Sequence, residues 1–264
     1  MSAASCLLSE DQFLCSICLD VFTDPVTTPC GHNFCKTCIT QHWDVNTLCQ
    51  CPMCKEVFKQ RSELHVNTFI SEMAELKKVQ DFEVDVTLDP DTANSHLILS
   101  DDGKQVNDSD AKKNLPDNPE RFSTCPCVLG KQSFSSGRFY YEVQVKGKTK
   151  WSLGVARESI NRKGKIPLSP KNGYWTICLR NENEYGAAAD PAVRLSLKSQ
   201  PQKVGVFVDY EEGLVSFYDV DAAALIYSYS GCSFTEKFHP FFSPDHRDGK
   251  NSAPLIICPV NQTD

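Results

Sequence analysis

The amino-acid sequence predicts two folded parts in series, a small zinc-stabilised α+β module followed by an all-β antiparallel sandwich. Three observations support this prediction. Cysteine and histidine residues cluster at metal-ligand spacings before position 55, a helical apolar period follows near position 70, and alternating strands begin at about Val84. We therefore place the zinc module at residues 1–62, a helical linker at 63–83 and the sandwich at 84–264.

The zinc module is predicted from the pattern C-x2-C-x11-C-x-H-x2-C-x2-C-x12-C-x2-C. A two-residue gap lets both thiolates of a pair converge on one ion from a tight turn, and zinc takes four Cys or His ligands in a closed tetrahedron. Eight ligands therefore predict two Zn²⁺ ions with no open position, so neither ion should carry out chemistry. The eight residues are Cys15, Cys18, Cys30, His32, Cys35, Cys38, Cys51 and Cys54.

Free side chains or a disulfide framework would be the alternatives to a metal site. Disulfides suit secreted chains, and Met1–Leu14 lacks the charged start and the apolar run of a signal peptide. The remaining cysteines are scattered, which favours reduced thiols and a cytoplasmic protein. They are Cys6, Cys49, Cys125, Cys127, Cys178, Cys232 and Cys258.

The composition restricts the classes of partner. A length of 264 residues suits about two domains, and no apolar run approaches the ~20 residues that span a bilayer. The net charge is −7; residues 1–83 hold 6 Lys and Arg against 11 Asp and Glu, and the remainder holds 21 against 23. Neither part is basic, so we expect no nucleic-acid partner, although zinc fingers often suggest one.

The order of the ligands resembles the RING finger family, in which the two sites interleave. The resemblance implies that Cys15, Cys18, Cys35 and Cys38 hold the first zinc, and that Cys30, His32, Cys51 and Cys54 hold the second. Cys49 could compete in register, but Cys51-Pro52-Met53-Cys54 matches the family better, so Cys49 is interpreted as a spare thiol.

Two helices are expected beside the finger. Ser9-Glu10-Asp11-Gln12 is typical of a capping box that opens a short helix, and a second helix is expected over 68–80 with Asn67 or Thr68 as its N-cap. Its apolar stripe consists of Phe69, Ile70, Met73, Leu76 and Val79. The stripe packs on the finger or, as the resemblance also allows, meets a second copy in a homodimer.

The sandwich is predicted from strands that alternate apolar and polar residues, among them Phe139–Val145, Trp151–Val155 and Val204–Val208. Several segments resemble a PRY-SPRY domain in that family's order. They include Leu88-Asp89-Pro90-Asp91-Thr92-Ala93-Asn94, Asn118-Pro119-Glu120-Arg121-Phe122, Ser136-Gly137-Arg138-Phe139-Tyr140, Trp151-Ser152-Leu153-Gly154-Val155, Gly173-Tyr174-Trp175-Thr176 and His239-Pro240-Phe241-Phe242-Ser243-Pro244.

A RING finger followed by PRY-SPRY resembles the tripartite-motif ubiquitin ligases, including their large fish-type expansions. The chain departs from that pattern because about 30 residues separate Cys54 from Val84, which leaves no room for a B-box or a long coiled coil. The departure puts the enforced dimer of that family in doubt.

The resemblance implies that the finger docks a ubiquitin-conjugating enzyme through exposed apolar residues. The docking candidates are Ile17, Leu19, Trp43, Pro52 and Lys55. Trp43 could instead pack inside the finger, and Lys55, where Arg would offer a planar fork, could be an ordinary solvated lysine.

The sandwich is expected to read a protein target with its loops. Candidate loops are Asp108–Asp117, Arg157–Asn172, Asn181–Ser199 and Pro244–Pro254. The second loop is basic and would suit an acidic partner, or it is merely solvated. Trp151, Tyr174 and Trp175 are interpreted as core aromatics rather than as a ligand cage.

The function implied by the resemblance is a RING-type ubiquitin-protein ligase, with an expected role in innate immunity. Its partners would be a conjugating enzyme, ubiquitin and an unknown protein target. The alternative is a non-catalytic adaptor or decoy in which the finger is structural. A nucleic-acid binder is the third and weakest hypothesis, because the chain is acidic.

Overall fold

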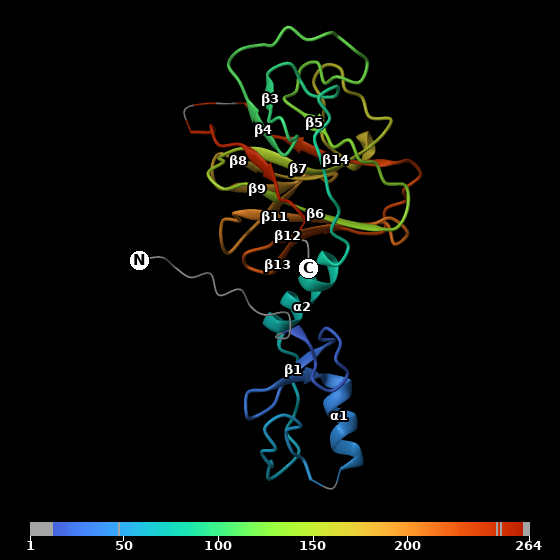
Figure 1. Cartoon of the computed structure of the whole chain (residues 1–264), viewed down its shortest axis with the longest axis vertical. Coiled ribbons are helices and arrows are strands. Elements are labelled where there is room, and N and C mark those ends of the chain that lie inside the picture. The colour runs from blue at the N-terminus through green and yellow to red at the C-terminus, as the bar shows by residue number, and fades with distance from the viewer. Residues whose placement is uncertain (1–12, 47, 247, 249, 261–264) are drawn as a thin grey trace. The chain divides into compact units, whose positions relative to one another are not determined.

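The computed structural model describes residues 13–46, 48–246, 248 and 250–260. It divides into two compact units, one that ends at Lys78 and one that begins at Val79 (Figure 1). The capping box expected at Ser9–Gln12 lies outside the described residues. Within them, the structure has no helix that is both long and apolar enough to cross a membrane.

The first unit is a finger built on one hairpin and one helix. Strands β1 (Pro25–Thr27) and β2 (Asn33–Cys35) pair in antiparallel register, and α1 (Lys36–Val45) follows directly. Gly31 supplies the left-handed backbone of the connecting turn, with φ of 85°. A few buried residues make up the apolar interior, which is small because the metal ligands occupy much of it; they are Phe22, Val26, Phe34, Ile39 and Trp43.

The second helix, α2 (Thr68–Gln80), has the bounds that the apolar period predicts. Asn67 is its cap, because the side-chain oxygen accepts a hydrogen bond from the backbone N–H of Ile70 at 3.2 Å. On its finger side, Ala74 is buried and Ile70 packs against the interior of the finger. Phe69 is exposed.

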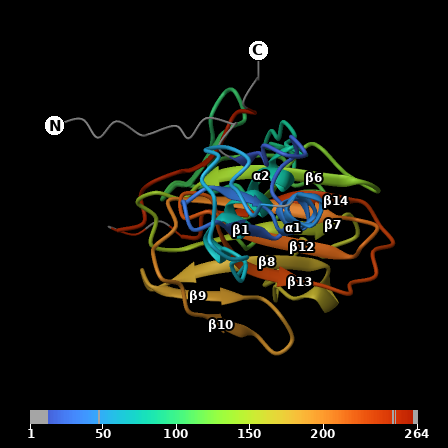
Figure 2. The ribbon, with the colours of Figure 1, turned by 90° about the horizontal axis from the view of Figure 1, so that it is seen from below.

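The second unit is a sandwich of two antiparallel sheets, which confirms the predicted fold class. One sheet has six strands in the order β10-β9-β8-β7-β14-β5, and its edge strand β10 lies beside β9 at one margin (Figure 2). These strands are β5 (Val128–Leu129), β7 (Trp151–Arg157), β8 (Tyr174–Arg180), β9 (Glu184–Ala187), β10 (Val193–Leu195) and β14 (Phe238–Ser243).

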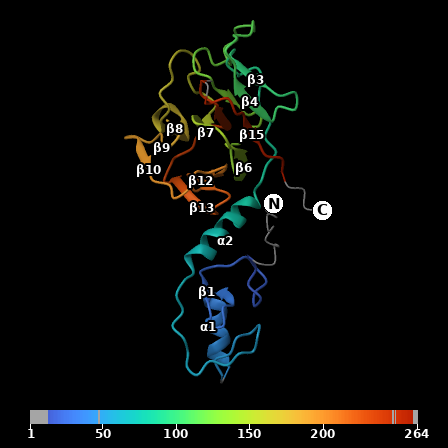
Figure 3. The same ribbon diagram turned by 90° about the vertical axis from the view of Figure 1, so that its left-hand side faces the viewer.

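The other sheet has seven strands in the order β13-β12-β11-β6-β15-β4-β3. Figure 3 shows β8, β9 and β10 along one side of the sandwich, apart from β12 and β13. The seven strands are β3 (Leu97–Leu99), β4 (Gln105–Asp108), β6 (Arg138–Gln144), β11 (Lys203–Asp209), β12 (Leu214–Asp219), β13 (Ala224–Tyr229) and β15 (Leu255–Ile257). A short 3₁₀ helix, η2 (Pro170–Asn172), precedes β8.

The core lies between the sheets, where alternate residues of each strand meet. Trp175, Ile177 and Leu179 of β8 belong to this core. The intervening residues Thr176 and Cys178 therefore face the outer side of the six-stranded sheet. Trp151 and Trp175 are buried in this core, and Tyr174 is buried in a separate apolar cluster with Phe122 and Phe241.

The stretch after α2 is built into the sandwich rather than free of it. Tyr140 of β6 donates its backbone N–H to the carbonyl of Phe82 at 2.8 Å, and Val84 donates to the carbonyl of Tyr140 at 2.9 Å. The buried carboxylate of Glu142 accepts hydrogen bonds from Gln80 and from the Tyr140 hydroxyl, each at 2.9 Å. Residues Phe82–Val84 thus pair with β6 through a parallel bridge between Glu83 and Tyr140.

One expected loop needs correction. The stretch Asn181–Ser199 was expected to be a binding loop, but it contains strands β9 and β10. Strand β9 is only four residues long and β10 only three. Pro191 and a run of Ala and Gly also interrupt the alternation of apolar and polar residues. The sequence pattern was therefore too short to indicate strands.

Candidate functional sites: two metal clusters and a cavity of the sandwich

Each outer Cys-x2-Cys pair of the finger forms the same turn. Leu19 donates its N–H to the Cys15 carbonyl at 2.7 Å, and Lys55 donates to the Cys51 carbonyl at 2.9 Å. Both Leu19 and Lys55, directly after the second cysteine of their pairs, have left-handed backbones with φ of 65° and 63°. This turn folds the two thiols of a pair back toward one point, as the spacing predicts.

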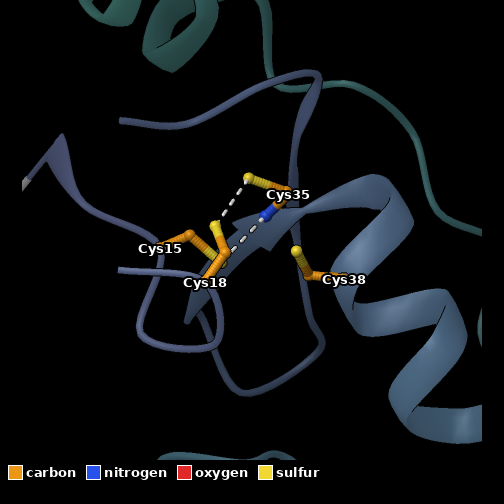
Figure 4. A group of neighbouring side chains, drawn as sticks. All are labelled: Cys15, Cys18, Cys35 and Cys38. Carbon is orange, nitrogen blue, oxygen red and sulfur yellow. Dashed lines mark hydrogen bonds between the residues drawn. The ribbon is translucent and has the colours of Figure 1, made fainter. Parts of the chain in front are cut away.

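The structure brings the eight predicted ligands together in two groups. One holds Cys15, Cys18, Cys35 and Cys38, and the other holds Cys30, His32, Cys51 and Cys54; within each group all ligand atoms lie within 4.8 Å of one another. A tetrahedral zinc–thiolate site has sulfur–sulfur separations of roughly 3.8 Å, and the Cys18 and Cys35 sulfurs lie 3.9 Å apart. Figure 4 shows the first group, with Cys38 contributed by α1. The geometry therefore fits two Zn²⁺ ions in interleaved sites.

The acid–base state of the thiols points to the same donor set. Burial and the neighbouring thiols raise the pKa of Cys38 to about 12. Burial also opposes ionisation of Cys30, but its bonds to Thr28 and His32 lower the pKa of that thiol to about 6. Closely packed thiols cannot all ionise without a cation, and a divalent ion supplies the missing charge as it displaces the protons.

The docking residues expected on the finger divide into surface and interior positions. Ile17 is 37% exposed and Leu19 is 73% exposed, while Pro52 is partly exposed. Lys55 is exposed, and its ammonium group donates to the carbonyl of Pro52 at 2.7 Å. The first three leave apolar surface in water, which a binding partner could cover.

Trp43 lies in the core of the finger, so the expectation that it forms part of an exposed docking surface is wrong. It is only 3% exposed, its indole N–H donates to the Gln50 carbonyl at 3.0 Å, and its ring meets Phe58 edge-on at 5.9 Å. The finger needs a large apolar group because its interior is small, and Trp43 on the inward face of α1 supplies it.

Met53 is a surface residue that the sequence analysis did not single out. It occupies the third position of the second outer Cys-x2-Cys turn, as Ile17 does in the first, and it is exposed. The repeated spacing could have shown this equivalence. Met53 is therefore a further candidate for contact with a partner.

The sandwich carries a cavity of about 740 Å³ on the outer face of its six-stranded sheet. We call it the outer-face cavity. Side chains from β7, β8 and β9 line it, together with the segments around Cys125–Cys127 and Ile166–Leu168 and with the start of the expected loop Pro244–Pro254. The candidate loops did not include the strand residues that line this cavity. The alternation of Thr176, Cys178 and Arg180 with the apolar residues of β8 could have indicated them.

The basic loop Arg157–Asn172 does not present free positive charge as expected for an acidic partner. Arg162 is buried and forms an ion pair with Glu120, and Lys163 pairs with Asp117 at 3.1 Å. Arg157 lies 3.7 Å from Glu236. Lys171 pairs with Asp190. Four of the five cations on this loop, all except Lys165, therefore hold it to neighbouring segments.

Comparison with known proteins matches three domain models along the chain. A RING-type zinc-finger model matches residues 15–52, a SPRY-associated domain matches 86–134 and a SPRY domain matches 138–255. Human zinc finger protein RFP is 43% identical over 81% of this chain and 42% of its own length. The bovine E3 ubiquitin-protein ligase TRIM21 is 47% identical over 67% of this chain and 38% of its own.

The solved structures support the fold of the sandwich. The crystal structure of the TRIM65 PSpry domain superposes with a TM-score of 0.59 at 23% identity, covering 70% of this chain and 95% of that one. The chain spans less than half the length of the two relatives. Finger, PRY and SPRY domains in this order make the chain a tripartite-motif-like RING and PRY-SPRY protein, with no B-box or long coiled coil between them.

Proposed function

We propose that the protein is a RING-type ubiquitin ligase that promotes transfer of ubiquitin from a conjugating enzyme to a protein target held by the sandwich. The observation that carries the proposal is the pair of closed four-ligand clusters, which fold a finger whose Ile17 side chain projects into solvent. The relationship to bovine TRIM21, which is named as an E3 ubiquitin-protein ligase, supports it.

The finger would act by positioning rather than by covalent chemistry. Its ligand thiols are committed to zinc, so none serves as a nucleophile. The reactive cysteine belongs to the conjugating enzyme, and a lysine of the target attacks the ubiquitin thioester. Holding these groups in a reactive geometry supplies the rate enhancement.

The target would bind the sandwich at the outer-face cavity. A concave site of this size with apolar walls and a few polar groups is what a ligand or an inserted side chain requires. We further infer a cytoplasmic protein, because the cysteines outside the metal clusters are scattered as reduced thiols would be. A role in innate immunity is part of the proposal and rests on the family resemblance alone.

The alternative is a non-catalytic adaptor or decoy. It is favoured by the short connection between finger and sandwich, since the structure has only α2 in the place of a long coiled coil. A finger that needs a homodimer would then be weak alone. Light scattering on the purified chain measures its mass and so tests whether α2, with Phe69 exposed, brings two copies together.

The experiment is an in vitro ubiquitination assay with a panel of conjugating enzymes. Wild type should build ubiquitin chains, and Ile17→Ala should lose them with two zincs still bound. Val45→Ala is the matched control, because Val45 is also an exposed β-branched residue of the finger but is not a docking candidate. Cys35→Ala should lose both zinc and activity. A zinc-loaded wild type that is inactive even at dimer-forming concentrations would favour the adaptor.

A further inference from the structure

The floor of the outer-face cavity is made of small side chains on neighbouring strands. Thr176 and Cys178 come from β8, and Gly186 lies opposite Cys178 on β9. A Cβ at Gly186 would lie 3.4 Å from the Val193 carbonyl and 3.7 Å from the Cys178 sulfur, which are ordinary contacts. The backbone at Gly186 does not require glycine. The effect of having no side chain at this position is that the cavity is deeper.

One polar group at this floor is unused. Thr176 is 0% exposed, and within the described part of the chain its hydroxyl has no hydrogen-bond partner. Its backbone carbonyl, in contrast, accepts from the Ala188 N–H at 2.9 Å and from the Tyr229 hydroxyl at 2.7 Å. A buried hydroxyl without a partner is costly unless something enters to bond it.

Sulfur lines the walls. Cys125, Cys127 and Cys178 all border the cavity, and burial raises the pKa of Cys127 and of Cys178, so these two thiols stay neutral. Neutral sulfur makes favourable contacts with the edges of aromatic rings, and it offers little to a charged ligand.

Arg180 lines the cavity with its charge already compensated. Its guanidinium donates to the carbonyls of Trp151 and Leu179, both at 2.7 Å, and to the Ser152 hydroxyl at 2.9 Å. Asp245 lies 3.4 Å away. The guanidinium plane is thus fixed, which suits stacking on a ring, while the local charge balance does not call for an anion.

We propose that the outer-face cavity binds an aromatic side chain of the target protein that carries a hydrogen-bonding group, such as a tyrosine, and that Thr176 bonds that group. The proposal rests on the proposed function in one respect only, namely that the aromatic ring belongs to a target protein. The unused hydroxyl, the neutral sulfurs and the fixed guanidinium each favour a polar-tipped aromatic group over an aliphatic or anionic one.

The experiment titrates side-chain analogues into the zinc-loaded full chain and follows its amide signals by NMR. The probes are p-cresol; toluene, which lacks the hydroxyl; 4-methylcyclohexanol, whose ring is saturated rather than aromatic; and N-acetyl-tyrosinamide, which adds the flanking amides of a peptide. We expect p-cresol and N-acetyl-tyrosinamide to shift amides of β8 and β9 and to bind roughly fivefold to tenfold more tightly than toluene.

Two variants locate the effect. Thr176→Val keeps the shape of the side chain and should bring p-cresol down to the affinity of toluene. Gly186→Val places a larger side chain beside Cys178 at the floor of the cavity and should weaken the binding of every probe. Gly186→Ala, with a smaller expected loss of affinity, replaces it if valine prevents folding.

Equal affinity of p-cresol and toluene for wild type would overturn the proposal. So would preference for 4-methylcyclohexanol, or p-cresol binding without any binding of N-acetyl-tyrosinamide, which would indicate a site for free small molecules. These titrations contain no conjugating enzyme, so their failure leaves the ligase proposal standing, and an inactive finger leaves the probe result intact.

Discussion

The finger and the sandwich obtain their order from different sources. The finger buries few apolar side chains and gathers eight ligand residues into two clusters, whereas the sandwich buries a continuous apolar core between two sheets. Metal coordination requires particular residues at particular spacings. An apolar core requires only alternation and suitable volume. A fault in one unit should therefore leave the other folded.

Removal of zinc should produce the largest difference between the two units. Binding of structural zinc contributes on the order of 10 kcal/mol or more to the folding of small zinc domains. A strong chelator should therefore collapse the NMR amide dispersion of residues 13–66 and leave the signals of 84–260 in place. If the amide signals of the finger stayed dispersed after complete zinc removal, its apolar core would be sufficient to fold it without metal.

A methyl group at Gly154 should produce the opposite fault. Gly154 has φ of 150°, and a Cβ on it would lie 2.1 Å from the carbonyl oxygen of Trp175. The two strands would therefore have to move apart, at a cost of roughly 3 kcal/mol or more. Chemical denaturation should show a destabilised sandwich while the zinc content stays at two. Gly186→Ala, which meets only ordinary contacts, should cost no more than about 1 kcal/mol.

Asn251 tests how the loop Pro244–Pro254 is fixed to the sandwich. Its fully buried amide accepts from the N–H groups of Thr149 and Lys150 and donates to the carbonyls of Pro244 and His246, all within 3.2 Å. Asn251→Ala leaves these backbone groups without a partner and should cost roughly 2–4 kcal/mol.

The matched control for that loop is Asn107→Ala. Asn107 is only partly buried, and it donates to the Ser252 carbonyl at 2.7 Å, so its loss should cost under about 1 kcal/mol. Both variants are measured by urea denaturation of the sandwich. Equal costs would mean that burial of Asn251 adds nothing to its hydrogen bonds.

Thr176→Val should have the smallest effect on stability. Its hydroxyl is buried without a partner, so replacement by a methyl group should leave the free energy of unfolding unchanged or raise it by up to about 1 kcal/mol. Thr92→Val is the control: that hydroxyl donates to the Asp89 carbonyl and accepts from the Leu129 N–H, and its removal should cost about 1–3 kcal/mol. A loss of similar size at Thr176 would show that its hydroxyl already has a structural partner.

The same contrast explains how far the sequence alone could lead. The ligand groups of the finger follow from spacing, and the bounds of α2 follow from its apolar period and its Asn67 cap. The buried position of Trp43 could not be predicted, because an apolar residue on a short helix suits a surface groove and a small core equally. The hydrogen bond from its indole N–H to the Gln50 carbonyl fixes Trp43 inside the finger.

The outer-face cavity was harder to predict than the clusters. Its lining comes from segments as distant in sequence as Cys125 and Asp245, and its depth depends on Gly186, whose backbone shows no unusual conformation. Strands β9 and β10 were missed because their patterns are very short. Only the outward series Thr176, Cys178 and Arg180 on β8 carried a readable signal.

The central claim, that the finger activates a conjugating enzyme by positioning it, is tested most directly by discharge of ubiquitin from a preformed enzyme thioester onto free lysine. This single-turnover assay needs no target protein. Our account predicts that the zinc-loaded chain accelerates discharge, that Val45→Ala does the same, and that Ile17→Ala removes the acceleration with both zincs bound. Discharge that is no faster with the wild-type chain than without it, across a panel of conjugating enzymes, would contradict the account.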